Sequence, residues 1–106
     1  MRTITEMEFA VAIRVVLAPI GVTQFGAVTG PGRSGAIASV YASHILGVPF
    51  LPYGQKCPAH LRPLLIVDTA RSTGSTLRKA ARKYGHDVVV VAVFDEPPRV
   101  KFWYEG

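Results

Sequence analysis

Apolar residues at helical intervals predict that the chain begins with an amphipathic helix. Thr5 and Glu8 have the spacing of a capping box, which typically marks the first turn of a helix. The apolar positions that follow recur every three or four residues until Pro19 and Gly21 interrupt them. The segment between these signals is therefore expected to form a helix with one face buried against the rest of the chain.

The remainder of the chain alternates between short apolar runs and helical patterns. Apolar runs without a regular polar alternation are typical of strands that are buried on both faces of a parallel sheet. The predicted strands are Phe25–Thr29, Val48–Leu51, Leu64–Val67, Val88–Phe94 and Val100–Tyr104. Helical spacing between them predicts two further helices, which end at Gly47 and Gly85. This order favours a three-layer α/β fold whose mostly parallel sheet binds ligands beyond the carboxyl ends of its strands.

Composition favours one globular domain over residues 1–106. Hydrophobic residues make up 49% of the chain and charged residues 18%, which argues against intrinsic disorder. A chain this short buries a smaller fraction of its surface than a larger protein does. We therefore expect it to self-associate as a homo-oligomer, most simply a dimer. No apolar run approaches the length that crosses a bilayer, and the single cysteine cannot form an internal disulfide. We therefore expect a cytoplasmic protein.

The formal net charge of +5 fits nucleic acid, an acidic membrane surface or a small polyphosphate. The cluster Arg78–Lys83 has helical spacing and is interpreted as a solvated helix face. We therefore expect neither a nucleic-acid nor a membrane partner. The residues of the loops between strands and helices indicate which small molecule is bound.

The segment Gly30–Gly35 has the G-x-G-x-x-G spacing between a predicted strand and a predicted helix. A dinucleotide site also needs an acid about twenty residues later, where the chain has Pro-Tyr-Gly-Gln at 52–55. A Walker loop would need lysine in place of Ala36. What remains is a loop whose backbone amides and Arg33 can bind an anion such as pyrophosphate at a helix N-terminus. The alternative is a tight turn with an exposed arginine.

The segment Asp68–Thr76 follows the apolar run Leu64–Val67 and is more informative. Its hydroxyls and glycine precede a predicted helix, where they can hold a phosphate monoester through amide and hydroxyl hydrogen bonds. Asp68 lies about the length of one sugar from the expected position of this phosphate, where it can accept hydrogen bonds from ribose hydroxyls. The segment therefore predicts a ribose 5-phosphate site.

The sequence LLIVDTARSTGST at 64–76 resembles the signature of the type I phosphoribosyltransferases, and the resemblance extends from Phe25 to the C-terminus. It implies a phosphoribosyltransferase-like fold with a reduced hood, similar to a small purine phosphoribosyltransferase. The implied reaction transfers ribose 5-phosphate from phosphoribosyl pyrophosphate to a nitrogenous base and releases pyrophosphate. The implied cofactor is Mg²⁺, bound through the substrate, with Asp68 as the candidate protein ligand.

The resemblance also implies roles for individual residues. Asp68 and Arg33 would be the catalytic residues, acting on the ribose and on the leaving pyrophosphate. Phe102 and Trp103 would stack on the base, and Glu96 would favour a base with an amino group. The alternatives are that the aromatic residues form an edge strand that packs on the core or on a partner subunit, and that Glu96 points to solvent. The full set of expected substrate-binding residues is Gly32, Ser34, Gly35, Thr69, Ala70, Arg71, Ser72, Thr73, Gly74, Ser75, Thr76, Glu96, Phe102 and Trp103.

The chain departs from the family pattern at several positions. Thr69 replaces the second acid, Ser72 replaces an aspartate near the base, and the loop 53–63 is short. In that loop the cations expected toward pyrophosphate are Lys56, His60 and Arg62. These departures leave open a non-catalytic nucleotide- or phosphoribosyl-pyrophosphate-binding regulatory module of the same fold. A third hypothesis is a doubly wound domain that binds FMN or a nucleotide.

Overall fold

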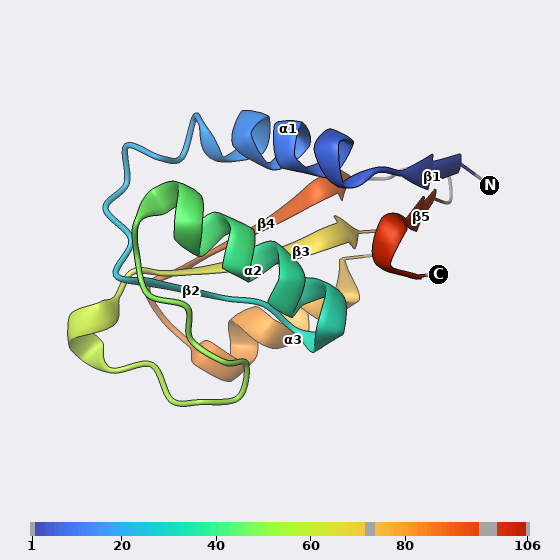
Figure 1. Cartoon of the computed structure of the whole chain (residues 1–106). Coiled ribbons are helices and arrows are strands. Elements are labelled where there is room, and N and C mark those ends of the chain that lie inside the picture. The colour runs from blue at the N-terminus through green and yellow to red at the C-terminus, as the bar shows by residue number, and fades with distance from the viewer. Residues whose placement is uncertain (1, 72–73, 96–99, 106) are drawn as a thin grey trace.

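A parallel sheet lies between two layers of helices in the computed structural model, which describes residues 2–71, 74–95 and 100–105. The strands are β2 (Ala27–Thr29), β3 (Leu64–Arg71) and β4 (Val88–Asp95), in the order β2-β3-β4. The α/β class and the parallel pairing predicted from the apolar runs are confirmed (Figure 1).

Several of the predicted strands differ in extent from those in the structure. The segment 48–51 contributes a single parallel bridge, Val28 to Phe50, although the Leu51 amide donates to the Val28 carbonyl at 2.8 Å. Strand β3 continues to Arg71, through residues that the sequence assigned to a loop. The longer strand is paired with β4 as far as Asp95, and this pairing extends the backbone past the apolar run.

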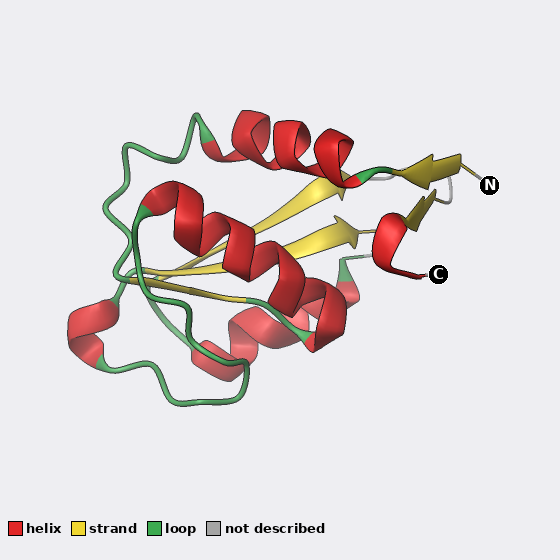
Figure 2. Ribbon diagram, viewed as in Figure 1, coloured by secondary structure: helices red, strands yellow, loops and turns green. Residues whose placement is uncertain are grey.

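Helices cover both faces of the sheet (Figure 2). Side chains alternate across a strand, so Val28, Leu65 and Val67 face the core formed with α1 (Glu6–Leu17) and α2 (Gly32–Leu46). Ala27, Leu64 and Ile66 face the other core, formed with α3 (Ser75–Tyr84). This arrangement confirms the expected three layers and explains why the central strands carry no polar alternation.

The first helix begins at the predicted capping box. The Glu8 amide donates to Thr5 Oγ1 at 3.1 Å, and the Thr5 amide donates to Glu8 Oε1 at 3.3 Å. Phe9, Ile13 and Leu17 point from this helix into the core and are at most 2% exposed. The capping box therefore determines where the helix begins, and burial of its apolar face stabilises it.

A second, two-stranded parallel sheet lies beyond the carboxyl ends of the main strands (Figure 1). It pairs β1 (Arg2–Ile4), which was not predicted, with β5 (Val100–Phe102). The predicted strand Val100–Tyr104 ends at Phe102, because residues Trp103–Glu105 turn as a 3₁₀ helix, η2. A further 3₁₀ turn, η1 (Ala59–Leu61), precedes β3. Within the described ranges, no helix has the length and apolar character required to span a membrane.

Candidate functional site

The two glycine-containing loops meet at the carboxyl edge of the main sheet. Helices α2 and α3 both begin at this edge, next to the small sheet and η2 (Figure 1). A Cβ atom placed on Gly30 would lie 2.4 Å from the Val67 carbonyl oxygen, so the first loop runs directly against β3 just before Asp68. The convergence expected from consecutive strand–helix units is confirmed.

The glycines of the first loop serve two purposes. Gly30 and Gly35 touch each other, since a Cβ on Gly35 would lie 2.5 Å from the Gly30 carbonyl carbon. Gly32 has a φ of +67°, which favours glycine, and a Cβ there would meet no atom within 4 Å. The outer glycines therefore allow the loop to close, and the space beside Gly32, at the start of α2, is open.

The two helices at this edge begin without the features that stabilise an ordinary N-terminus. The cap residues Pro31 of α2 and Gly74 of α3 make no side-chain capping bond, and neither first turn contains an acid. Helix α1 has both a capping box and acids in its first turn. The first backbone amides of a helix lack intrahelical partners and lie at the positive end of its dipole. The starts of α2 and α3 are therefore suited to bind anions.

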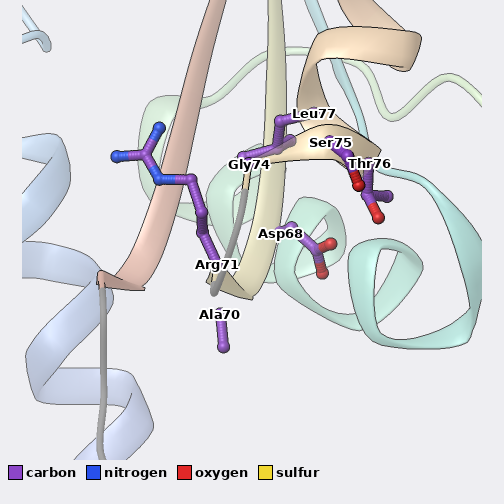
Figure 3. Close-up of a pocket in the computed structure, with 7 residues that line it drawn as sticks. All are labelled: Asp68, Ala70, Arg71, Gly74, Ser75, Thr76 and Leu77. Carbon is purple, nitrogen blue, oxygen red and sulfur yellow. The ribbon is translucent and has the colours of Figure 1, made fainter.

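A pocket of about 70 Å³ lies at the start of α3. Its lining residues are Asp68, Ala70, Arg71, Gly74, Ser75, Thr76 and Leu77. The Asp68 carboxylate and the hydroxyls of Ser75 and Thr76 lie on one side, whereas the Arg71 side chain extends the other way (Figure 3). The pocket thus brings together six of the residues that the sequence assigned to the phosphate and ribose site.

Asp68 is partly buried at the base of this pocket. Burial raises the pKa of its carboxyl above the ordinary value of 3.8, and hydrogen bonds from the amide and side chain of Thr69 oppose that rise. The Thr69 amide donates to Asp68 Oδ1 at 2.7 Å. Thr69 itself is only 3% exposed. The residue that stands in place of a second acid therefore supports the charge of the first.

Arg33 and Ser34 lie in the first turn of α2, and Tyr104 of η2 contacts both of them. The Tyr104 hydroxyl donates to Ser34 Oγ at 2.7 Å, and the Arg33 guanidinium lies over the Tyr104 ring, 5.7 Å from its centroid. Sequence reasoning placed Tyr104 in the aromatic tail expected near the base but not among the substrate-binding residues, and it predicted no contact with Arg33 or Ser34. Its place in the Phe-Trp-Tyr run was the available signal.

Phe102 and Trp103 pack on other aromatic rings. Phe102 is 5% exposed and lies 6.2 Å from Phe9, centroid to centroid. Trp103 lies 5.5 Å from Phe9 and 6.4 Å from Tyr41. Their contact with a base remains a prediction. The assigned residues Ser72, Thr73 and Glu96 lie outside the described residues.

Arg62, one of the cations expected toward pyrophosphate, contacts the C-terminal end of α3 in the structure. Its guanidinium donates to the carbonyls of Tyr84, at 2.8 Å, and of His86, at the C-terminal end of α3. The pocket lies at the other end of this helix, which spans ten residues or about 15 Å. Arg62 instead satisfies carbonyls that the end of α3 leaves without helical partners.

Among the described residues, Asp68 is the carboxylate that lines the pocket. Within the described part of the chain, no three His, Cys, Asp or Glu side chains lie close enough to bind a metal together. Mg²⁺ commonly keeps one or two protein carboxylates and takes its other ligands from substrate phosphates and water. The site fits a Mg²⁺ ion that arrives with a polyphosphate substrate.

Solved structures with the same architecture identify the fold. A purine phosphoribosyltransferase from Pyrococcus horikoshii aligns with a TM-score of 0.71 and 20% identity, over 97% of this chain and 94% of that one. The xanthine-guanine-hypoxanthine phosphoribosyltransferase of Helicobacter pylori aligns with a TM-score of 0.80 and 12% identity, over 98% and 91%. A hypothetical protein from Neisseria gonorrhoeae with bound ppGpp aligns with a TM-score of 0.70 and 18% identity, over 95% and 80%.

Sequence comparison adds no relative, since no protein-family model and no curated protein matches the chain. At these identities the structural likeness concerns the backbone arrangement. The parallel sheet, its two helical layers and the small sheet beyond its carboxyl edge together give this chain a phosphoribosyltransferase-like fold.

Proposed function

We propose that the chain is a phosphoribosyltransferase that transfers ribose 5-phosphate from phosphoribosyl pyrophosphate to a nitrogenous base and releases pyrophosphate. One observation carries the proposal. Two helix N-termini without side-chain caps or first-turn acids begin at the same sheet edge, beside a partly buried carboxylate. Phosphoribosyl pyrophosphate has the matching chemistry, namely a phosphate group and a pyrophosphate group joined by a sugar with free hydroxyls.

Each part of the site receives one part of the substrate. The amides and hydroxyls of Gly74, Ser75 and Thr76 bind the 5′-phosphate at the start of α3. Asp68 accepts hydrogen bonds from ribose hydroxyls. The start of α2, with Arg33 and Ser34, binds the pyrophosphate.

In the reaction a base nitrogen forms a bond to the anomeric carbon as the bond to the pyrophosphate oxygen breaks, and the proton of that nitrogen passes to the released pyrophosphate or to water. Positive charge develops on the ribose, where the negative charge of Asp68 stabilises it. Negative charge develops on the leaving pyrophosphate, which the positive end of α2 and Arg33 stabilise. Mg²⁺, bound through the pyrophosphate with Asp68 as candidate ligand, would neutralise part of that charge. The protein mainly positions the reactants, which is consistent with the small number of side chains involved.

The base is proposed to bind near η2 and Glu96. A carboxylate can only accept hydrogen bonds, so Glu96 would favour an exocyclic amino group at the position it contacts, as in adenine or cytosine, over an oxygen there. Amino-bearing bases should then outcompete hypoxanthine. A preference for hypoxanthine or guanine would remove Glu96 from the site.

Titration calorimetry with phosphoribosyl pyrophosphate and Mg²⁺, followed by assay of pyrophosphate release with a panel of bases, tests the proposal. Binding together with base-dependent release of pyrophosphate supports a transferase. Absence of binding contradicts both the reaction and the assignment of the two helix N-termini.

A second candidate is a non-catalytic module that binds phosphoribosyl pyrophosphate or a nucleotide and regulates another protein. Thr69 in place of an acid removes one charged acceptor from the ribose site. The similar Neisseria gonorrhoeae structure contains ppGpp, which carries two diphosphate groups. Binding of either ligand without release of pyrophosphate, whichever base is added, would favour this candidate.

A further inference from the structure

The C-terminal turn is attached to the first turn of α2 through Tyr104. Its hydroxyl donates to Ser34 Oγ at 2.7 Å across a separation of 70 residues in the chain. Its ring lies under the Arg33 guanidinium. One side chain therefore contacts both of the polar residues that are proposed to bind pyrophosphate.

Tyr104 is held in place from several sides. Its ring stacks on Phe102, with centroids 5.7 Å apart and planes 12° apart, and meets Trp103 edge-on at 5.0 Å. Glu105 closes the turn by accepting a hydrogen bond from the Phe102 amide at 2.9 Å. Because Phe102 is buried in the core, the turn places the Tyr104 hydroxyl at a fixed position relative to α2.

Chemistry makes Tyr104 the donor in its bond to Ser34, because a phenol hydroxyl is more acidic than a serine hydroxyl and the serine oxygen is the better acceptor. A serine hydroxyl has one proton to donate, and helical serines often donate it to a backbone carbonyl of the preceding turn. Ser39 of the same helix does so, to the Ala36 carbonyl at 2.8 Å. Ser34 accepts from Tyr104, which leaves its own proton for another acceptor. A hydroxyl that accepts one hydrogen bond also donates a stronger one.

We propose that Tyr104 is a positioning residue for the pyrophosphate-binding turn: its hydroxyl holds Ser34 as a hydrogen-bond donor toward pyrophosphate, and its ring holds Arg33 beside it. This inference rests on the proposed function, because it takes pyrophosphate as the ligand of α2. It adds a residue that contacts the substrate only through Ser34 and Arg33.

Calorimetry with pyrophosphate plus Mg²⁺, and separately with ribose 5-phosphate, tests the inference on five proteins. These are the unaltered chain, Tyr104→Phe, Tyr104→Leu, Ser34→Ala and the double variant Ser34→Ala with Tyr104→Phe. Tyr41→Phe is the matched control, since the Tyr41 hydroxyl makes a similar bond, to Glu6 at 2.7 Å. Thermal unfolding of each variant shows that it is folded.

Tyr104→Phe should weaken pyrophosphate binding about two- to tenfold, the usual effect of one neutral hydrogen bond, and leave ribose 5-phosphate binding unchanged. Tyr104→Leu should weaken pyrophosphate binding further, because the ring over which Arg33 lies is also lost. In the Ser34→Ala background, Tyr104→Phe should have no additional effect, since the two hydroxyls act as one unit. Tyr41→Phe should bind both ligands as the unaltered chain does.

Two results contradict these expectations and can be told apart. If the unaltered chain binds pyrophosphate and Tyr104→Phe binds it equally well, or if the losses from Tyr104→Phe and Ser34→Ala simply add, the inference is wrong while the proposed function stands. If the unaltered chain binds neither pyrophosphate nor ribose 5-phosphate, the proposed function fails and the inference fails with it.

Discussion

Asp68 is charged and partly buried. Its charge is expected to strengthen ribose binding, whereas burial of that charge is expected to lower the stability of the fold. Its carboxylate is the proposed acceptor for ribose hydroxyls. Replacement by Asn keeps the shape of the side chain but removes the charge, and hydrogen bonds to charged groups contribute about 1.5–3 kcal/mol. We expect Asp68→Asn to weaken phosphoribosyl pyrophosphate binding about tenfold or more in calorimetry. Unchanged affinity would mean that Asp68 has a structural role only.

The same substitution should change how stability depends on pH. Burial raises the pKa of Asp68 above 3.8, so its contribution to folding is complete below that pH and is lost as pH rises through the pKa of the folded state. Asn cannot lose a proton. The free energy of unfolding of Asp68→Asn, relative to the unaltered chain, should therefore increase with pH over this range and then level off. Urea unfolding at a series of pH values measures it, and a difference that falls as pH rises would contradict the burial argument.

Arg33 is expected to distinguish the two phosphate sites. It lies in the first turn of α2 and is exposed, so its removal should cost little stability. We expect Arg33→Ala to weaken free pyrophosphate about tenfold or more, because a charged hydrogen bond is lost, and to leave ribose 5-phosphate nearly unchanged. Calorimetry with each ligand measures the ratio, with Arg14→Ala on α1 as the control. Equal losses for both ligands would overturn the separate assignment of the two helix N-termini.

At the scale of helices, the first turn of α3 contains no acid. This leaves the start of the helix able to bind phosphate but makes the helix less stable than it would be with an acid there. An acid in the first turn normally stabilises a helix by about 0.3–1 kcal/mol. Thr76→Glu is therefore expected to raise the free energy of unfolding slightly and to abolish ribose 5-phosphate binding by charge repulsion. Thr76→Gln, which has the size of Thr76→Glu without the charge, is the matched control and should lose only the hydroxyl contact, about two- to tenfold in affinity. If Thr76→Glu binds ribose 5-phosphate as well as Thr76→Gln does, the phosphate is not at this helix end.

Local sequence signals predicted the elements that depend on neighbouring residues. Helix α1 follows its capping box, and the starts of α2 and α3 follow from strand–loop–helix order, although β3 continues to Arg71 through residues that were predicted to form a loop. Elements that depend on distant partners were missed or misplaced. Strand β1 is only three residues long, and its partner begins at Val100. The segment 48–51 is apolar but finds just one bridge, to Val28.

In the site, too, features that depend on neighbouring residues could be predicted, and features that depend on distant partners could not. Parallel order is enough to place Asp68 and Arg33 at one sheet edge, so their convergence could be predicted. The contact between Tyr104 and Ser34 could not, because it depends on how the small sheet directs η2 across the edge. The interaction of Arg62 with the end of α3 likewise depends on the path of the loop before β3, which no local pattern determines.

At the scale of the whole molecule, an exposed apolar face on α1 is consistent with the self-association expected for a chain this short. Met7, Val11 and Val15 follow one another at four-residue spacing and are 77%, 59% and 67% exposed. We expect sedimentation velocity to show a dimer that Val11→Glu weakens, because the substitution places a charge in an apolar contact. Val22→Glu, in the turn after α1, is the control. A chain that remains monomeric at high concentration would contradict this expectation.

The account as a whole rests on one substrate spanning the two helix N-termini and Asp68. Titration of the unaltered chain with phosphoribosyl pyrophosphate in the presence of Mg²⁺ measures this most directly, with ribose 5-phosphate and pyrophosphate titrated separately. We expect phosphoribosyl pyrophosphate to bind more tightly than either fragment, because it occupies both helix ends with one loss of translational freedom. Phosphoribosyl pyrophosphate that binds no more tightly than its fragments, or does not bind, would contradict the account.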